Sequence, residues 1–110
     1  MGLFKKLFKP KNVNSKRFRL EMAEMISKKL IRYVTERKDD VEEVIGKSGA
    51  FSIRNGEFIV FASSEVVFRT PVEDMQAWEL LSGDGVVLTG IDLEHGNVER
   101  TITVHYVYYR

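Results

Sequence analysis

The clearest pattern of apolar positions lies in residues 16–37. Apolar side chains recur there at steps of three and four, which is typical of one face of an amphipathic helix. The residues that form this stripe are Phe18, Met22, Met25, Ile26, Leu30, Tyr33 and Val34. The spacing therefore predicts a long helix over residues 16–37, with basic side chains on much of its remaining surface.

A shorter helix is predicted over residues 40–45. Asp40 and Glu43 have the spacing of a capping box, in which two side chains bond the free amides at a helix start. Gly46 follows at the position where glycine commonly ends a helix. We therefore expect this short helix to connect the long helix to the rest of the chain.

From residue 47 onwards the apolar positions alternate, as they do in half-buried strands. Asn55-Gly56 separates two alternating runs and is a strong hairpin signal, because both residues tolerate a positive φ. Ser63-Ser64 predicts a second turn, and a helical turn is predicted over residues 71–75 because Pro71 suits its first position. Residues 76–81 suit either a strand or an extension of that turn. The strands predicted after the second turn cover residues 65–70, 86–91 and 98–109.

These elements predict an α+β fold with a single domain over residues 16–110. Short links between successive strands make neighbouring strands antiparallel. We expect five or six strands over residues 50–109, which form a meandering, strongly bent antiparallel sheet with the shape of a half-barrel. The long N-terminal helix is the one predicted element large enough to cover the apolar face of this sheet.

Residues 1–15 form a basic, amphipathic arm ahead of this domain. Apolar residues at helical spacing are interleaved with lysines, and Pro10 ends any helix there. A helix of one or two turns is not stable alone in water, so the apolar face needs a partner. The residues that we expect to make this contact are Phe4, Lys5, Lys6, Leu7, Phe8 and Lys9.

Composition and charge narrow the classes of function. The chain has 110 residues, of which 44% are hydrophobic and 30% charged, and it has no cysteine. This suits one globular domain and excludes disulfide-linked partners, thiolate metal sites and a cysteine nucleophile. Twelve basic and three acidic residues lie in positions 1–38, against five basic and thirteen acidic residues in positions 39–110. Such asymmetry occurs at contact surfaces for nucleic acid or anionic lipid, and also where a basic helix packs on an acidic sheet.

Few residues suggest reactive chemistry. Asp92, Glu94 and His95 form the one cluster that resembles a metal site. Acids beside Gly-Asn are also what a solvated hairpin loop requires, so we expect a loop and no metal. His105 lies inside the last predicted strand, and Gly46-Lys47-Ser48-Gly49 lacks the first glycine of a phosphate-binding loop. We therefore predict a protein without a cofactor and without catalytic activity.

The order of strands and turns over residues 47–110 is carried by four runs: GAFSIRNGEFIVF, EVVFRTPVEDM, AWELL and GVVLTGI. This order resembles that of small bacterial pleckstrin-homology-like domains. The resemblance implies a strongly bent antiparallel sheet that presents variable loops to partners. Two features differ from the family, because this chain has its long helix first and ends in a strand. No lipid-binding residue of the family has a counterpart here.

The sequence as a whole predicts a small cytoplasmic, non-catalytic protein-interaction module. Its partner would be another protein or a second copy of the chain, contacted through the arm of residues 1–15. Two alternatives remain open: the basic arm binds nucleic acid or an anionic membrane surface, or the domain carries a small ligand in a cavity between helix and sheet.

Overall fold

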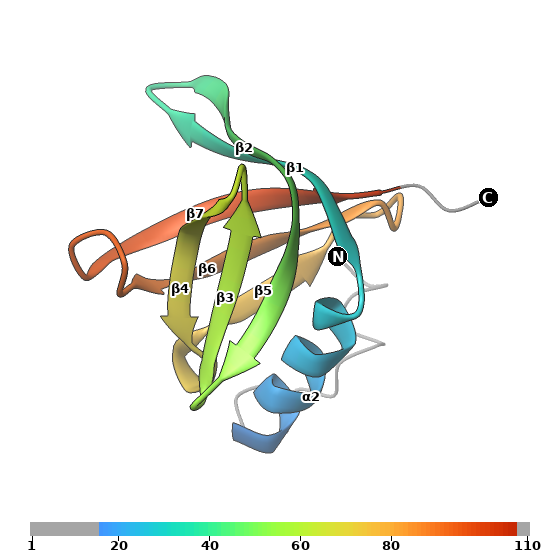
Figure 1. The fold of residues 1–110 in the computed structure, drawn as a ribbon, viewed down its shortest axis with the longest axis vertical. Helices are drawn as coiled ribbons and strands as arrows, with labels where there is room; N and C mark the ends of the chain where they lie inside the picture. The colour runs from blue at the N-terminus through green and yellow to red at the C-terminus, as the bar shows by residue number, and fades with distance from the viewer. Residues whose placement is uncertain (1–15, 108–110) are drawn as a thin grey trace.

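One α-helix and seven strands make up the described fold, and a short 3-10 helix links two of the strands (Figure 1). The computed structural model describes residues 16–107, with Lys16 and Arg17 described by their backbone alone. The elements in chain order are α2 (Lys16–Ser27), β1 (Leu30–Lys38), β2 (Val41–Arg54), β3 (Glu57–Ala62), β4 (Glu65–Pro71), η2 (Val72–Asp74), β5 (Gln76–Glu79), β6 (Gly85–Asp92) and β7 (Val98–Tyr106). The predicted α+β class is therefore confirmed.

The strands form one antiparallel sheet in the order β4-β3-β2-β1-β7-β6-β5. Two meanders, β1 to β4 and β5 to β7, are joined where β1 pairs with β7. The chain passes from one edge strand to the other through residues 72–75, and four residues span at most about 14 Å. The two edges therefore approach each other at this end, although β4 and β5 are not paired.

The predicted meandering, antiparallel arrangement is confirmed, but two details of the sheet differ. It has seven strands rather than five or six, and it begins at Leu30 rather than at residue 50. The strongly bent half-barrel that we expected is wrong, because the sheet is neither closed nor strongly curled and its edge strands, β4 and β5, do not pair with each other.

The long helix predicted over residues 16–37 is wrong in its second half. α2 ends at Ser27, and the chain from Leu30 onwards forms β1. The register of β1 against β7 shifts between Ile31 and Tyr33, so that Ile31 and Val34 are both buried in the core. A spacing of three between inward side chains imitates a helical stripe. The apolar pattern therefore continues from the helix into the strand without a visible break.

The short helix predicted over residues 40–45 is also wrong, because these residues belong to a hairpin that extends beyond the rest of the sheet (Figure 1). Asp39 and Asp40 have φ values of 52° and 65°, the left-handed conformation of a two-residue hairpin turn, which Asp tolerates. Gly46 ends no helix. It lies in β2, where a Cβ atom would be 2.6 Å from the Cβ of Ala62.

Several local predictions are confirmed. Asn55 and Gly56 have φ values of 52° and 77°, as the β2–β3 hairpin requires. Ser63 and Ser64, with φ values of 55° and 65°, make the turn between β3 and β4. The helical turn after Pro71 is η2, and the segment that suited either structure, residues 76–81, contains the strand β5.

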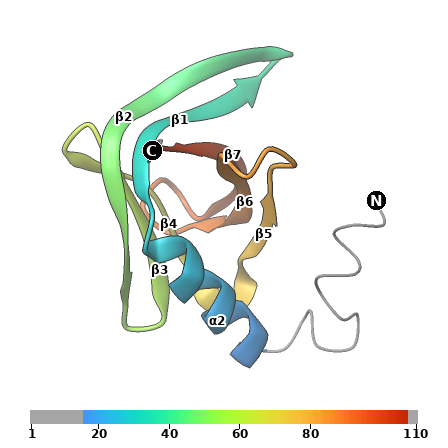
Figure 2. The same cartoon turned by 90° about the vertical axis from the view of Figure 1, so that its right-hand side faces the viewer.

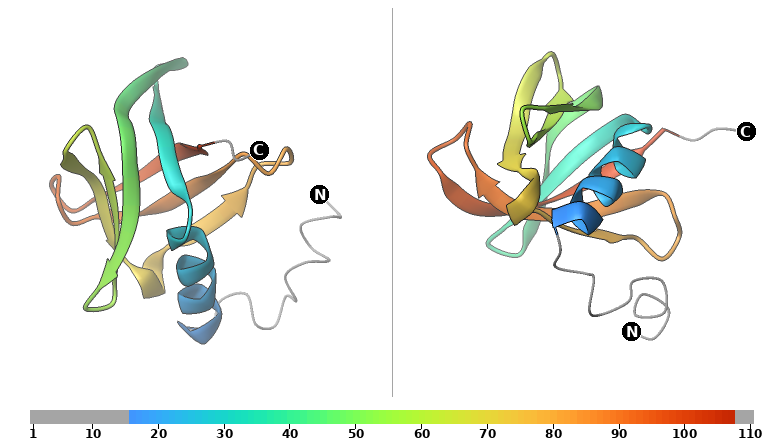
Figure 3. Two further views of the ribbon diagram at one scale, coloured as in Figure 1. Left: turned by 45° about the vertical axis from the view of Figure 1, so that its right-hand side comes forward. Right: turned by 90° about the horizontal axis from the view of Figure 1, so that it is seen from below.

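The apolar core lies between α2 and the inward face of the sheet (Figures 2 and 3). α2 contributes Met22, Ala23 and Ile26 and packs against β2 and η2. Burial of apolar side chains is the main stabilising contribution in such a domain. The largest fully buried side chains are Phe58, Phe68, Ile26, Ile31, Leu88 and Ile102. No helix within residues 16–107 is long and apolar enough to cross a bilayer.

Candidate functional site

Arg100 is the centre of a buried polar network that joins four strands. From β7 it donates two hydrogen bonds to the Glu36 carboxylate on β1, with Nε–Oε2 and Nη2–Oε1 distances of 3.0 and 2.7 Å. Its Nη1 donates to the carbonyl oxygen of Val67 on β4, at 3.0 Å, and to the carboxylate of Asp92 at the end of β6. A forked guanidinium suits this role, because it holds a carboxylate with two parallel bonds.

The Asp92 side chain is fully buried, and its carboxylate accepts hydrogen bonds from four residues of the described range. The donors are Arg100, His95 Nδ1 at 2.8 Å, and the backbone N–H groups of Glu94 and Arg69 at 3.0 and 3.2 Å. Burial acts to raise the pKa of Asp92, but these hydrogen bonds together outweigh it and hold the pKa below its ordinary value. Asp92 therefore stays ionised and fixes the shape of the β6–β7 loop.

The cluster of Asp92, Glu94 and His95 is a loop anchor in the structure. Glu94 bonds Arg69 Nε at 3.0 Å, whereas His95 bonds Asp92. The acids of the cluster are thus engaged by guanidinium and backbone donors. Within residues 16–107 no group of three acidic or imidazole side chains is placed to hold a metal ion.

The free edge of β4 is covered by the same loop. The backbone N–H of Arg69 donates to Asp92, and its carbonyl oxygen accepts a hydrogen bond from the N–H of Leu93 at 2.7 Å. Its guanidinium also pairs with Glu57 at 2.8 Å. An uncovered edge strand can pair with another chain, so these contacts protect the second half of β4 from that.

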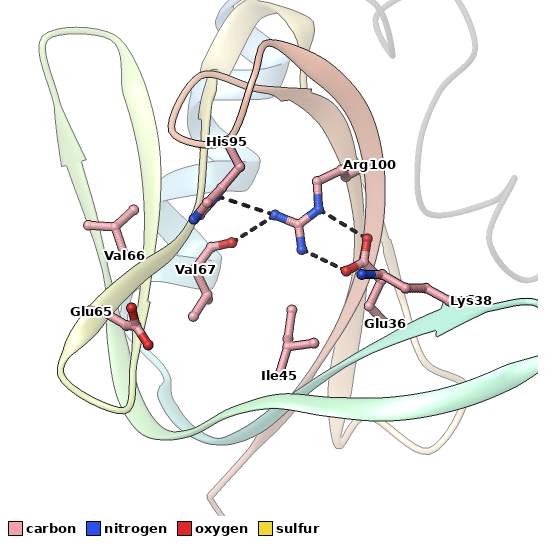
Figure 4. A pocket seen from close by; sticks show the side chains of 8 residues that line it. All are labelled: Glu36, Lys38, Ile45, Glu65, Val66, Val67, His95 and Arg100. Carbon is pink, nitrogen blue, oxygen red and sulfur yellow. Dashed lines mark hydrogen bonds and ion pairs between the residues drawn. The ribbon is translucent and has the colours of Figure 1, made fainter.

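A pocket of about 360 Å³ lies beside this network, where β4 begins (Figure 4). The β1–β2 hairpin forms one wall and β4 forms another, while His95 projects from the β6–β7 loop. We call this site the β4 pocket. Its lining residues are Glu36, Lys38, Ile45, Glu65, Val66, Val67, His95 and Arg100.

Two of the charged groups in the β4 pocket already neutralise each other. The Arg100 hydrogen bonds lower the pKa of Glu36 against the opposing effect of burial, and the same Glu36 bonds raise the pKa of Arg100. By contrast, the side chains of Lys38 and Glu65 form no ion pair with any residue in the range 16–107. These two remain available to a ligand.

His95 is the third available group. Its side chain is 48% exposed, and its Nδ1 lies 2.8 Å from the Asp92 carboxylate and 3.5 Å from Arg100 Nη1, so Nε2 is the ring nitrogen left for a ligand. Among the described residues, no hydroxyl or thiol lines the β4 pocket, so none of them is a nucleophile that His95 could activate there. The pocket offers recognition groups of both signs beside the apolar side chains of Ile45, Val66 and Val67.

The structure does not test the arm residues that we singled out. Phe4, Lys5, Lys6, Leu7, Phe8 and Lys9 lie outside the described residues. His105, which we placed in a strand, does lie in β7 and stacks on Tyr33 with ring centroids 4.4 Å apart. The Gly46–Gly49 run lies in β2 and forms no loop.

Sequence reasoning missed Glu36 and Arg100. Glu36 belongs to the helix predicted over residues 16–37, and the helical pattern does not indicate that its side chain faces the sheet. Arg100 did leave a signal, because it shares the strand parity of Ile102 and Val104, which face the core. An inward-facing arginine needs a carboxylate partner, and this could have been inferred from β7 alone.

The chain matches no family model, no curated protein and no solved structure. The resemblance of residues 47–110 to pleckstrin-homology-like domains therefore stays a prediction.

Proposed function

We propose that the protein is a non-catalytic interaction module that binds an extended segment of a partner protein in the β4 pocket. The observation that supports this is the combination of an apolar wall with available charges of both signs. Ile45, Val66 and Val67 provide the wall, and Lys38 and Glu65 provide the charges. Backbone and side chains of a peptide present the same mixture of groups.

The size and support of the β4 pocket suit such a ligand. Ligand pockets range from about 300 to 1,000 Å³, and this one lies near the lower end with about 360 Å³. That volume accommodates a few side chains rather than a large cofactor. The walls are strands held by the Arg100 network, so the pocket needs little rearrangement to bind.

The state of the ionisable groups argues for recognition rather than catalysis. Glu36 and Asp92 are held ionised by Arg100, and using either as an acid or base would require breaking a buried ion pair. His95 has an available Nε2, but the lining offers it no nucleophile. In this proposal its Nε2 hydrogen-bonds the bound segment.

A small-ligand carrier is the second candidate, and the volume of the β4 pocket is the observation that favours it.

The contact with protein, nucleic acid or an anionic membrane surface that we expect from residues 1–15 is a separate proposal. It rests on the lysines and apolar residues of the arm alone.

The test compares two lysine variants that differ in the face of the sheet they occupy. Lys38→Glu reverses a charge in the β4 pocket, whereas Lys47→Glu reverses one on β2 opposite Tyr33, outside the pocket. Partners captured from cell extract by the full-length protein should be retained by Lys47→Glu and lost by Lys38→Glu. Equal capture by both variants would overturn the proposal.

A small molecule found by native mass spectrometry in the purified protein, and lost in Lys38→Glu, would support the carrier instead.

A further inference from the structure

The two edges of the sheet are protected differently. The edge of β4 is bonded by Arg100, by Asp92 and by the backbone of Leu93. β5 pairs with β6 along its whole length without a register shift, and it contains no proline and no lysine. Natural edge strands usually carry a bulge, a proline, a lysine or a covering segment. β5 has none of the first three, and its shortness, at four residues, is the protection that the described residues show.

The surface around β5 is apolar and acidic. Trp78 and Leu81 are 41% and 80% exposed, and the exposed Glu73 and Asp74 lie directly before the strand in η2. We call Glu73, Asp74, Trp78 and Leu81 the β5 surface. Exposed apolar side chains form a contact site when they lie together in one patch, and a polar rim commonly surrounds such a patch.

The segment that precedes α2 has the complementary character. Residues 1–15 contain four lysines and no acid, whereas all sixteen acids of the chain lie within residues 16–107. Their apolar residues Leu3, Phe4, Leu7 and Phe8 recur at the spacing of one helical face. Both the charge and the apolar content of residues 3–9 therefore match the β5 surface.

The position of α2 brings this segment to the right end of the molecule. α2 packs against η2, and Arg19 in its first turn donates to the backbone carbonyl oxygen of Glu73. Figure 2 shows the first turn of α2 at the same end of the molecule as the start of β5. Residues 9–15 can span up to about 24 Å, which is enough to carry residues 3–8 alongside β5.

We propose that residues 3–8 of this chain pack on the β5 surface of the same molecule. Phe4, Leu7 and Phe8 cover Trp78 and Leu81, and the neighbouring lysines face Glu73 and Asp74. The contact is independent of the β4 pocket. Any other partner that binds residues 3–8 must first displace them from the β5 surface.

Trp78 reports on this contact directly, because it is the only tryptophan of the chain. The experiment measures acrylamide quenching of its fluorescence in the full-length protein and in the full-length variant Phe4→Ser/Leu7→Ser/Phe8→Ser. We expect the quenching constant to rise about twofold in the triple variant, with a red shift of the emission, since an uncovered indole is open to water and quencher. Val13→Ser changes the same segment outside the proposed contact and should leave the quenching unchanged.

A second variant tests the opposite side of the contact. Glu73→Gln/Asp74→Asn keeps residues 3–8 intact and should raise the quenching constant in the same direction, by a smaller amount, because it removes only the charge attraction. Far-ultraviolet circular dichroism confirms that each variant is folded. Equal quenching in the wild type and the triple variant would overturn the proposal. Shielding of Trp78 that appears only as protein concentration rises would overturn it too, because the covering segment would then belong to a second copy.

Discussion

Arg100 and Glu36 lie 64 positions apart in the sequence and form a two-pronged ion pair, with N–O distances of 3.0 and 2.7 Å. The pair joins β7 to β1, and the remaining nitrogen of the guanidinium reaches β4 and β6 through Val67 and Asp92. One side chain thus connects strands from both meanders. Its removal should affect stability far more than the loss of an ordinary surface charge.

Arg100→Met should destabilise the domain by about 3 kcal/mol or more, because it leaves the carboxylates of Glu36 and Asp92 buried without their cation. Urea denaturation followed by circular dichroism measures this. Arg54→Met is the matched control, since Arg54 is exposed at the end of β2 and its removal should cost less than about 0.5 kcal/mol. Equal losses in the two variants would contradict the assignment of Arg100 as the centre of the network.

Acid should destabilise the protein through the same network. Hydrogen bonds from Arg100 lower the pKa of Glu36 against the effect of burial, and in Asp92 burial is outweighed by Arg100, His95 and two backbone amides. The unfolded chain, with ordinary carboxyl pKa values, therefore binds protons at a higher pH than the folded one. The stability that these groups provide is present above about pH 5 and is lost as the pH falls below about 4 toward the folded pKa values.

Urea midpoints measured from neutral pH down to acid pH check this expectation. Glu36→Gln should reduce the dependence on pH, because it removes one of the two groups with a lowered pKa. Asp74→Asn changes an exposed carboxylate outside the network and should keep the wild-type profile. A midpoint that does not fall in acid would argue against the ionised network.

Two buried threonines should respond in opposite directions to the same change. Thr70 is fully buried, and its hydroxyl has no hydrogen-bond partner among residues 16–107, whereas Thr35 Oγ1 donates to Glu42 at 2.6 Å. Thr70→Val should leave the free energy of unfolding unchanged or raise it by up to about 1 kcal/mol, and Thr35→Val should lower it by about 1 kcal/mol. Thermal unfolding of both variants makes the comparison, and an equal cost would refute it.

Gly49 marks a close approach between β2 and β3. A Cβ atom there would lie 1.7 Å from the carbonyl oxygen of Phe61, which is backbone and cannot move aside without breaking the strand pairing. Gly49→Ala should therefore cost about 3 kcal/mol or more in unfolding free energy. Gly83→Ala is the control, because its φ of 80° is unfavourable for alanine but the space is open, and about 1 kcal/mol is expected. A cost for Gly49→Ala no larger than that of the control would contradict the close contact.

The parts of the fold that local chemistry determines were predictable. Asn55-Gly56 and Ser63-Ser64 were recognised as turns because their conformation depends on the residues themselves. The helix predicted through Leu30 is wrong because a register shift in β1 puts Ile31 and Val34 on one face of the strand. The helix predicted up to Ile45 is wrong because Asp40 suits a hairpin turn as well as a helix cap. Register is a property of two paired strands, so the sequence of one strand alone does not reveal it.

The candidate site was less predictable than the fold. The sequence places His95 and Asp92 in one cluster, but the cluster resembles a metal site. Nothing in the local sequence indicates that Arg100 donates to the carboxylate of Asp92. The partner of Arg100 on β1 is separated from it by most of the domain. The β4 pocket depends on that long-range pairing and on the projecting hairpin, and both arise only once the strands have assembled.

The pairing of β1 with β7 has a consequence for biosynthesis. Tyr106 at the end of β7 bonds in register with Ile31 near the start of β1, so the middle of the sheet is built from the first and last strands of the described chain. During translation the two meanders can form separately, but they cannot be joined until β7 has left the ribosome. A nascent chain stalled before β7 should therefore remain open to proteases, and acquisition of resistance should come late and in one step.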